Sequence, residues 1–523
     1  MEARKKNRAL IALIGVVILS LIAMMLWNAP LAWRSLKATL KSGRPSLSAF
    51  EEQLQLRLTG SVALKYNFID LNGWFAARLG QTECNKIIRL SNGMLTDTYG
   101  PLNLTPGADS MVEFKDYLAE LGIEFLYVQA PFKVDPGKLL LPRGCEDFSN
   151  ENVDALIARA AEGGVDVLDL RPTISATPEL VERYYYRTDH HWNYDGAFAA
   201  TQLILERLRA HFPDANFDFD RADLSQWDSH TLSNWFLGSH GERTGRFFGG
   251  VDDFTYYTPK FDTRISCLVS SDNQVYTGDF SDAIMRSEAH LSEPCYFNKS
   301  AYSLYLGGDY GLTLLRNPDA PNDLRILVIK DSYARPVCSF LSTMFREVAL
   351  VDSRYFTDTS VAEYVRYRHP DLVVQLNYPK TIEINPEYFQ YGTAEAAAKD
   401  LDAIRAVLAP QDVTISQDAG SYSSLPVRLE RGQSYILRFD GIEFAGEASD
   451  GAAVGLYDPA ADKSIHIATF DVEYSRENGD FAWYFTVPED AGENLELRFC
   501  AGLPQNPAPG GVTYRGVRLD AAG

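Results

Sequence analysis

Residues 184–196 read Tyr-Tyr-Tyr-Arg-Thr-Asp-His-His-Trp-Asn-Tyr-Asp-Gly, and they place Asp189, His190, His191 and Trp192 in consecutive positions. The whole chain has only 8 histidines, so two adjacent ones directly after an aspartate form a distinctive pattern. On an extended chain the side chains at i and i+2 point to the same side, which pairs Asp189 with His191. A carboxylate can orient an imidazole, and an imidazole can move a proton near neutral pH. The stretch therefore predicts a general base together with its orienting acid.

The nucleophile that such a base needs is predicted far downstream, in residues 325–334, Arg-Ile-Leu-Val-Ile-Lys-Asp-Ser-Tyr-Ala. An apolar strand here leads into a sharp turn that carries Ser332 and then into a helix. The first amides of that helix can donate hydrogen bonds to a developing oxyanion. We therefore predict Ser332 as the nucleophile, His191 as its base and Asp189 as the acid that orients the base.

Other interpretations of these residues stay open. Both motifs also occur as purely structural features, and His190 is an alternative base. Asp189, His190, His191 and Asp195 are alternative metal ligands, as in a metal-dependent hydrolase. They lack the i, i+4 spacing that brings ligands together on a helix, so the sequence predicts a site without metal or cofactor.

Helices and strands alternate around these motifs, from about residue 66 to residue 410. The alternation predicts a mostly parallel sheet with helices on both faces, interrupted by a long irregular insertion at about 212–322. Strands are expected at 123–129, 165–170, 326–329, 347–351 and 371–376, and helices around 109–121, 153–160, 198–208, from Ser332 through Phe345, 362–368 and 393–408.

The pattern changes to period two after about residue 410. Apolar side chains alternate with polar ones in several short segments, for example at Tyr435, Leu437 and Phe439. Residues 411–523 are therefore predicted to form a small antiparallel β-sandwich. Candidate rings for stacking on sugars in this region are Trp483, Tyr484 and Tyr457.

An apolar run at residues 9–27 is long enough to cross a bilayer, which takes about 20 residues. A cleavable signal peptide is the alternative, but no convincing small-x-small cleavage site follows the run. Residues 1–30 are thus predicted as a transmembrane anchor and residues 31–65 as a connector. The short leading tail and the large following body favour a single-pass protein of the cell membrane with its large domains on the extracytoplasmic side.

Charge and cysteine usage narrow the possible partners. The net charge of −21 argues against nucleic acid as a partner, because phosphate neutralisation needs basic surface. The 6 cysteines show no metal-type spacing. In an oxidising compartment Cys267 with Cys295 and Cys84 with Cys145 are the short-loop pairings to expect, and Cys338 is expected to be a buried thiol.

The segments Thr188-Asp-His-His-Trp-Asn193 and Val328-Ile-Lys-Asp-Ser-Tyr-Ala334 resemble the DHHW family. That family is related to the AlgX/AlgJ-type alginate O-acetylation proteins, which have an SGNH hydrolase-like domain. The resemblance covers roughly residues 60–405. It implies an SGNH-like α/β fold in which Ser332 is the nucleophile, His191 the base and Asp189 its orienter, and in which the Asp-x-His pair precedes the serine.

The chain departs from the pattern of that family at two places. The glycine that usually precedes Asp-Ser is Lys330 here, and a clear Gly-x-Asn-Asp block is absent. Candidates for oxyanion or substrate contacts are therefore Tyr333, Asn377, Gly238 and His190.

The function expected from these observations is O-acetyl transfer or acetyl-ester hydrolysis on a cell-surface or exported polysaccharide, through an acyl-enzyme. The resemblance implies that a membrane-bound O-acyltransferase delivers the acetyl group. It also implies that the C-terminal sandwich is similar to carbohydrate-binding modules. The alternative is a non-catalytic glycan-binding or polysaccharide-assembly protein on the same scaffold.

Overall fold

The computed structural model describes residues 22, 26–30, 32–41, 51, 64–270, 274–378, 386–399, 404–416, 422–449, 451–503, 506–508 and 510–522. The chain divides into two compact units, residues 1–85 with 242–248 and residues 86–241 with 249–523. Among the described residues, no helix is both long and apolar enough to span a membrane. Most of the span predicted at residues 9–27 lies outside the described residues.

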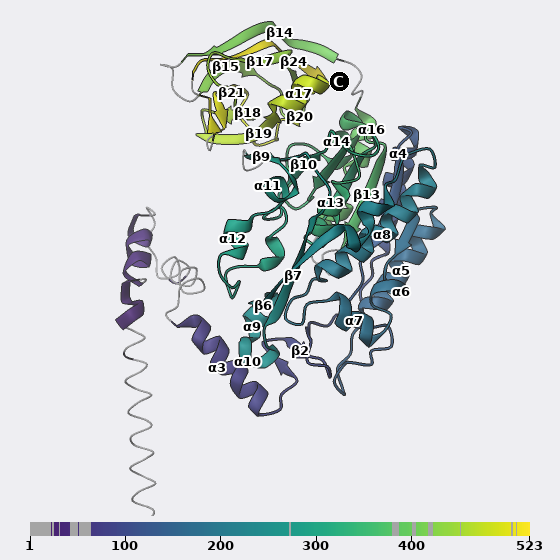
Figure 1. Cartoon of the computed structure of the whole chain (residues 1–523). Coiled ribbons are helices and arrows are strands. Elements are labelled where there is room, and N and C mark those ends of the chain that lie inside the picture. Colours follow the sequence, from purple (N-terminus) through teal and green to yellow (C-terminus); the bar gives the residue numbers. More distant parts are fainter. Residues whose placement is uncertain are drawn as a thin grey trace, which may run out of the picture. The chain divides into compact units, whose positions relative to one another are not determined.

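The larger unit is built on an eight-stranded sheet with the order β5-β4-β13-β11-β12-β10-β8-β9. Figure 1 labels β13, β10 and β9 of this sheet. Its first five strands run parallel, as the α/β alternation predicts. In sheet order they are β5 (Asp166–Asp169), β4 (Glu124–Gln129), β13 (Leu372–Asn377), β11 (Arg325–Lys330) and β12 (Glu347–Val351).

The insertion at 212–322 contributes more to the fold than loops. It supplies three strands that extend the sheet in antiparallel fashion beyond β12, namely β10 (Leu312–Arg316), β8 (Ile265–Val269) and β9 (Gln274–Gly278). A separate two-stranded ribbon in the insertion pairs β6 (Trp227–Phe236) with β7 (Asp252–Pro259). The expectation of an irregular insertion is therefore corrected, because its apolar segments complete the edge of the main sheet.

Helices bury their apolar sides on both faces of this sheet, in two separate core clusters. Phe198 and Phe340 lie in one cluster, and Phe114 and Val361 lie in the other. The principal helices are α4 (Thr105–Glu120), α5 (Ser149–Glu162), α7 (Pro178–Tyr184), α8 (Tyr194–His211), α13 (Ala334–Leu341), α14 (Val361–Arg368) and α16 (Thr393–Ala398).

The end of this α/β region differs from the sequence expectation. The helix expected over 393–408 stops at Ala398, and β14 (Ile404–Ile415) runs across the predicted boundary near residue 410. Pairing of β14 with the last strand, β24 (Val512–Ala522), explains the difference. A partner that lies about a hundred residues away overrides a local preference for helix.

The C-terminal region forms two antiparallel sheets that share one hydrophobic core. One sheet has the order β14-β24-β16-β20, with β17 (Gly441–Phe444) also paired to β24, and the other has the order β15-β21-β18-β19. The remaining strands are β16 (Ser434–Arg438), β20 (Ala482–Thr486), β15 (Tyr422–Arg428), β21 (Asn494–Cys500), β18 (Gly451–Asp458) and β19 (Lys463–Asp471).

All six cysteines are free thiols. The pairings expected for Cys267 with Cys295 and for Cys84 with Cys145 are therefore wrong. Cys338 is buried, as predicted, and burial raises the pKa of its thiol to about 12.

Candidate active site

Ser332 lies in the turn between β11 and α13, at the carboxyl end of the parallel sheet. The turn is held by the buried Asp331, whose carboxylate accepts hydrogen bonds from the backbone N–H groups of Tyr333 (2.8 Å) and Tyr378 (2.6 Å). Because Tyr378 directly follows β13, Asp331 ties the serine turn to the end of the neighbouring strand. Ligand sites of open α/β sheets form at such strand ends.

The structure brings Ser332, His191 and Asp189 into one hydrogen-bonded chain. The Nε2 atom of His191 lies 2.7 Å from the Ser332 Oγ, and its Nδ1 atom lies 2.5 Å from Asp189 Oδ1. An ionised carboxylate only accepts, so Nδ1 carries the proton and Nε2 is left to accept one from the serine hydroxyl. This is the arrangement that a nucleophile, its base and the orienter of that base require.

Asp189 is locked in place on both carboxylate oxygens. Its Oδ1 also accepts the backbone N–H of His191 (2.9 Å), and its Oδ2 accepts the backbone N–H of Ser239 (2.7 Å). Burial raises the pKa of the Asp189 carboxyl, but the charges of His191 and His190 and the hydrogen bonds from His191 outweigh it and hold that pKa well below its usual range. Asp189 is therefore an anion at neutral pH.

Gly238 positions Asp189 and leaves its own N–H occupied. Its backbone N–H donates to Thr188 Oγ1 at 2.9 Å. A Cβ atom at this position would stand 2.2 Å from the Cβ of Asp189, which only a glycine avoids. The sequence predicts Gly238 as an oxyanion candidate. In the structure its N–H is bound to Thr188, and its close contact with Asp189 helps to position the Asp189 carboxylate.

His191 is supported by an aromatic residue of the insertion that the sequence analysis did not single out. The ring of Tyr302 stacks on the imidazole with centroids 3.8 Å apart and planes 15° apart. Its hydroxyl accepts the indole N–H of Trp192 at 3.1 Å, and the same N–H also reaches the Tyr333 carbonyl at 3.1 Å. No local pattern marks Tyr302, because it joins the site from more than a hundred residues away.

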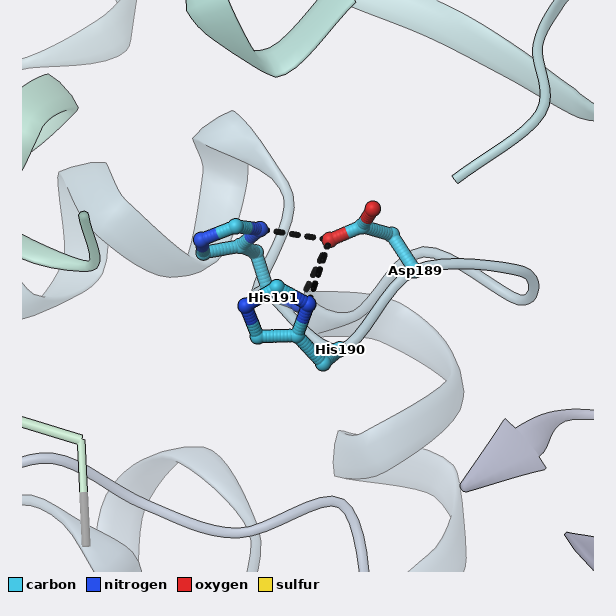
Figure 2. A group of neighbouring side chains, drawn as sticks. All are labelled: Asp189, His190 and His191. Carbon is cyan, nitrogen blue, oxygen red and sulfur yellow. Dashed lines mark hydrogen bonds and ion pairs between the residues drawn. The ribbon is translucent and has the colours of Figure 1, made fainter. Parts of the chain in front are cut away.

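His190 lies beside His191, and both rings face the same carboxylate oxygen of Asp189 (Figure 2). Its Nδ1 atom lies 2.6 Å from Ser239 Oγ and 3.5 Å from Asp189 Oδ1, and its ring centroid is 3.7 Å from that of His191. Burial and the neighbouring His191 hold the pKa of His190 well below its usual value. The imidazole that meets Ser332 is that of His191.

Asp189, His190 and His191 also offer ligand atoms that lie within 4.8 Å of one another. Asp195 lies apart from this group, and its carboxylate accepts the hydroxyl of Tyr257. Both ring nitrogens of His191 already have partners in Asp189 and Ser332. A metal ion bound to these side chains would have to displace the hydrogen bonds that join them.

Tyr333 and Asn377, two of the residues predicted to contact the oxyanion or substrate, are both buried. Tyr333 is fully buried, stacks on Tyr378 with centroids 4.4 Å apart, and donates its hydroxyl proton to the carbonyl of His190. Asn377, the last residue of β13, is also fully buried. Within the described part of the chain, neither polar atom of its side-chain amide has a hydrogen-bond partner.

Lys330, which replaces the glycine expected before Asp331, points into a buried ionic cluster. Its ammonium lies 2.7 Å from Asp309 and 3.2 Å from Asp352, and its side chain is 2% exposed. Arg354 approaches both of these carboxylates, and Arg335 approaches that of Asp309. The lysine therefore joins the serine turn to the loop around Asp309.

A second buried lysine holds the aspartate side of the site. Lys133 donates to the backbone carbonyls of Leu95 (2.8 Å), Arg187 (3.3 Å) and Asp189. All three protons of an ammonium are satisfied by this set. Burial lowers the pKa of Lys133 to about 8, against the opposing charges of Asp252, Asp189 and Asp97.

The rings predicted to stack on sugars are mostly covered. Trp483 is 5% exposed within the shared core of the C-terminal sheets, and Tyr484 is 3% exposed on the opposite side of its strand, against Tyr367. Neither ring has a face open to a sugar, so the prediction for these two residues is corrected. Tyr457 is half-buried, and the guanidinium of Arg498 lies over its ring at 3.1 Å.

Comparison with known proteins finds two family models that match this region of the chain. A family model described as an SGNH hydrolase-like domain of the acetyltransferase AlgX matches residues 92–225. The model of the DHHW proteins matches residues 177–351, which include Asp189, His191 and Ser332. The resemblance of this chain to the DHHW and AlgX-type proteins is therefore confirmed.

Solved structures with similarity to the chain come from several bacteria. PatB1 of Bacillus cereus is 20% identical over 58% of this chain and 99% of that one, with a TM-score of 0.49. A DHHW family protein from Eubacterium siraeum is 19% identical over 59% and 95%, with a TM-score of 0.45. AlgX of Pseudomonas aeruginosa is 13% identical over 84% and 94%, with a TM-score of 0.38. No curated protein sequence matches the chain.

Proposed function

We propose that this protein is an O-acetyltransferase or acetylesterase that acts on a polysaccharide through an acyl-enzyme at Ser332. The observation that carries the proposal is the unbroken chain of hydrogen bonds from Asp189 through His191 to Ser332. Support for acetyl chemistry comes from the match to a family model named for an acetyltransferase.

In the first half of the reaction, Ser332 Oγ attacks the carbonyl carbon of an acetyl ester while its proton passes to His191 Nε2. The bond between that carbon and the leaving oxygen breaks, and the leaving oxygen takes the proton from His191. The acetyl group is then held as an ester on Ser332. Proton transfer of this kind contributes about 10² to 10⁴ in rate.

In the second half, the acceptor gives its proton to His191 and attacks the acetyl carbon, and Ser332 Oγ takes the proton back. A sugar hydroxyl as acceptor makes the protein a transferase, and water makes it an esterase. Asp189 stays ionised throughout and stabilises the imidazolium that forms in each half.

Asn377 is the proposed side-chain donor to the oxyanion. It ends the strand that Asp331 ties to the serine turn, and its amide is buried without a partner among the described residues. Leaving such a group unpaired costs about 1–3 kcal/mol, so an oxyanion that accepts its N–H would recover this energy in the transition state.

The setting of the reaction is proposed from the sequence. The apolar run at residues 9–27 would anchor the chain in the cell membrane with the two described units on the extracytoplasmic side. A membrane-bound O-acyltransferase would then supply the acetyl group, and an exported or cell-surface glycan would accept it. The C-terminal sheets would form a β-sandwich that holds the glycan near the site.

Hydrolysis of 4-nitrophenyl acetate, with and without an oligosaccharide acceptor, tests this function. We expect Ser332→Ala to abolish turnover and to abolish labelling by a fluorophosphonate, with the label of the parent found on the peptide that contains Ser332. Ser424→Ala, at an exposed serine of β15, is the matched control and should keep both. Equal rates in Ser332→Ala and parent would contradict the proposal, and glycan binding without labelling would favour the non-catalytic alternative.

A further inference from the structure

Helix α3 (Lys65–Arg78), in the smaller unit, has its small residues inside and its large apolar residues outside. Its buried side contains Gly73 and Ala76. A Cβ atom on Gly73 would stand 2.0 Å from the carbonyl oxygen of Thr244, so the helix is docked closely on the segment that carries Thr244. The buried side of α3 therefore consists of small residues and is already packed against the segment that carries Thr244. In most surface helices of globular proteins the large apolar residues form the buried side.

The opposite side of α3 and its flanking residues form a stripe of large apolar side chains. The spacing is i, i+4, i+7, i+11 and i+15, which keeps them on one face of a helix. They are Leu64 (53% exposed), Phe68 (48%), Leu71 (47%), Phe75 (51%) and Leu79 (73%), with Trp74 (39%) beside them. Such a continuous exposed face marks an interaction surface and not ordinary surface composition.

The charged residues of α3 are basic except for one acid, in a protein whose net charge is −21. Lys65 stands at the start of the helix and Arg78 at its end, where its guanidinium lies over the ring of Trp74 at 5.4 Å. The single acid of the helix, Asp70, is turned inward and paired with Arg246 at 2.6 Å. The outer face therefore carries apolar and cationic groups without a carboxylate of its own helix.

The preceding part of the chain repeats this composition. Residues 32–41 are helical, with Trp33 (58% exposed) and Leu40 (61%) interleaved with Arg34, Lys37 and Lys41. Before them comes the apolar run at residues 9–27, which would hold the helix close to a bilayer and raise its effective concentration there.

We propose that the outer face of α3 binds the surface of a lipid bilayer that contains anionic lipid. Aromatic and leucine side chains would enter the boundary between headgroups and acyl chains, and Lys65 and Arg78 would meet the anionic headgroups. The helix would then be a second membrane attachment, in the plane of the membrane and separate from the predicted span. This inference does not depend on the acetyl chemistry.

Quenching of Trp74 fluorescence tests the contact in the full chain, reconstituted into vesicles of phosphatidylcholine and phosphatidylglycerol with brominated acyl chains. The signal of Trp74 is the difference between the parent and Trp74→Phe. We expect this difference to lose intensity in brominated vesicles. The matched control is the difference for Trp483→Phe, a buried tryptophan of the C-terminal sheets, which should stay unquenched.

A double variant, Phe68→Ser with Phe75→Ser, separates the stripe from the predicted span. We expect it to remove the quenching of Trp74 while the chain stays in the vesicles and keeps its thermal transition. Replacing phosphatidylglycerol by phosphatidylcholine should also reduce the quenching. An unquenched Trp74 in the parent overturns the proposal. A dimer of the parent in sedimentation that becomes a monomer in the double variant also overturns it, because the outer face of α3 would then bind a second copy of the chain.

Discussion

At the level of single residues, buried ionised side chains hold the candidate site in place. Asp189 orients His191, Lys133 satisfies the backbone carbonyl of the same Asp189, and Lys330 meets Asp309 and Asp352 beneath the serine turn. A buried charge is costly unless partners compensate it, and each of these has hydrogen-bond partners, which for Lys133 are backbone carbonyls. These charged side chains therefore hold the backbone around Ser332 and His191 in place, and they also influence which groups of the site are ionised.

The substitution Lys133→Met should change how stability depends on pH. The pKa of Lys133 is about 8 in the folded chain and about 10.4 in an unfolded one. Between these values the folded state binds fewer protons, so rising pH favours folding. The free energy of unfolding of the parent should rise relative to that of Lys133→Met by up to about 1.4 kcal/mol per pH unit in this window. Below about pH 8 the two should change in parallel.

Urea unfolding at a series of pH values measures this difference. The control is Lys463→Met, whose side chain is 64% exposed in the C-terminal sheets and should not alter the pH dependence. Parallel curves for the parent and Lys133→Met above pH 8 would show that Lys133 titrates as an ordinary lysine.

At the scale of elements, three chain segments meet at the carboxyl edge of the parallel sheet. The turn between β11 and α13 brings Ser332, the loop before α8 brings Asp189 and His191, and the segment that follows β6 brings Gly238 and Ser239. The third segment belongs to the insertion, and its backbone binds the second oxygen of Asp189. The insertion thus builds part of the site.

Gly238→Ala should disturb this meeting point, because the new methyl group would stand 2.2 Å from the Cβ of Asp189. We expect kcat for 4-nitrophenyl acetate to fall about 100-fold, as for a displacement of roughly 1 Å at a reacting group. The loss of stability should be about 1–3 kcal/mol, as for overpacking.

Gly455→Ala is the matched control, since its nearest neighbours would lie 3.7 Å and 3.8 Å from the added atom. Steady-state kinetics and urea unfolding of both variants measure the two effects. Unchanged kcat in Gly238→Ala would show that the loop yields without moving Asp189.

At the scale of the larger unit, a buried ionic network joins the α/β sheet to the C-terminal sheets. Arg316 on β10 lies 3.0 Å from Glu347 on β12 and 2.7 Å from Asp480, which precedes β20. Arg368 at the end of α14 contacts the same two carboxylates. Burial raises the pKa of Glu347, but the three arginines around it outweigh this and lower that pKa to about 2.

Asp480→Ala should loosen this junction by leaving two buried arginines with one carboxylate between them. Breaking a buried pair in this way costs about 3 kcal/mol. Differential scanning calorimetry should show the transition moved to lower temperature or split into two. Asp490→Ala is the control at an exposed acid whose nearest lysine is 3.8 Å away, and a transition that moves equally in both variants would contradict a junction at Asp480.

Much of the secondary structure could be predicted from the sequence because its signals are local. The strand expected at 326–329 is β11, that at 347–351 is β12, and the helix expected around 153–160 is α5. The pairing of Asp189 with His191 is also local, since it follows from their i, i+2 spacing. Whether Ser332 acts as the nucleophile stays a prediction, although the structure places it against His191.

The aromatic candidates show where the sequence alone is insufficient. Alternation predicts that Trp483 and Tyr484 point to opposite sides of a strand, and they do. It cannot tell that one side faces the shared core and the other faces Tyr367 of α14, so that both rings are buried. Whether a second element covers a side chain depends on how helices and strands pack together. The alternation of residues within one strand carries no information about that packing.

The sequence by itself determined the period of each element, the Asp-x-His pair and the strand-to-turn context of Ser332, because each depends on neighbours within a few residues. Only the tertiary structure decided that Tyr302 stacks on His191, that Lys133 binds the Asp189 carbonyl and that Gly238 makes room for Asp189. The physical reason is distance along the chain. These contacts join residues about 50 to more than 100 positions apart, and they form only when the whole core closes around them.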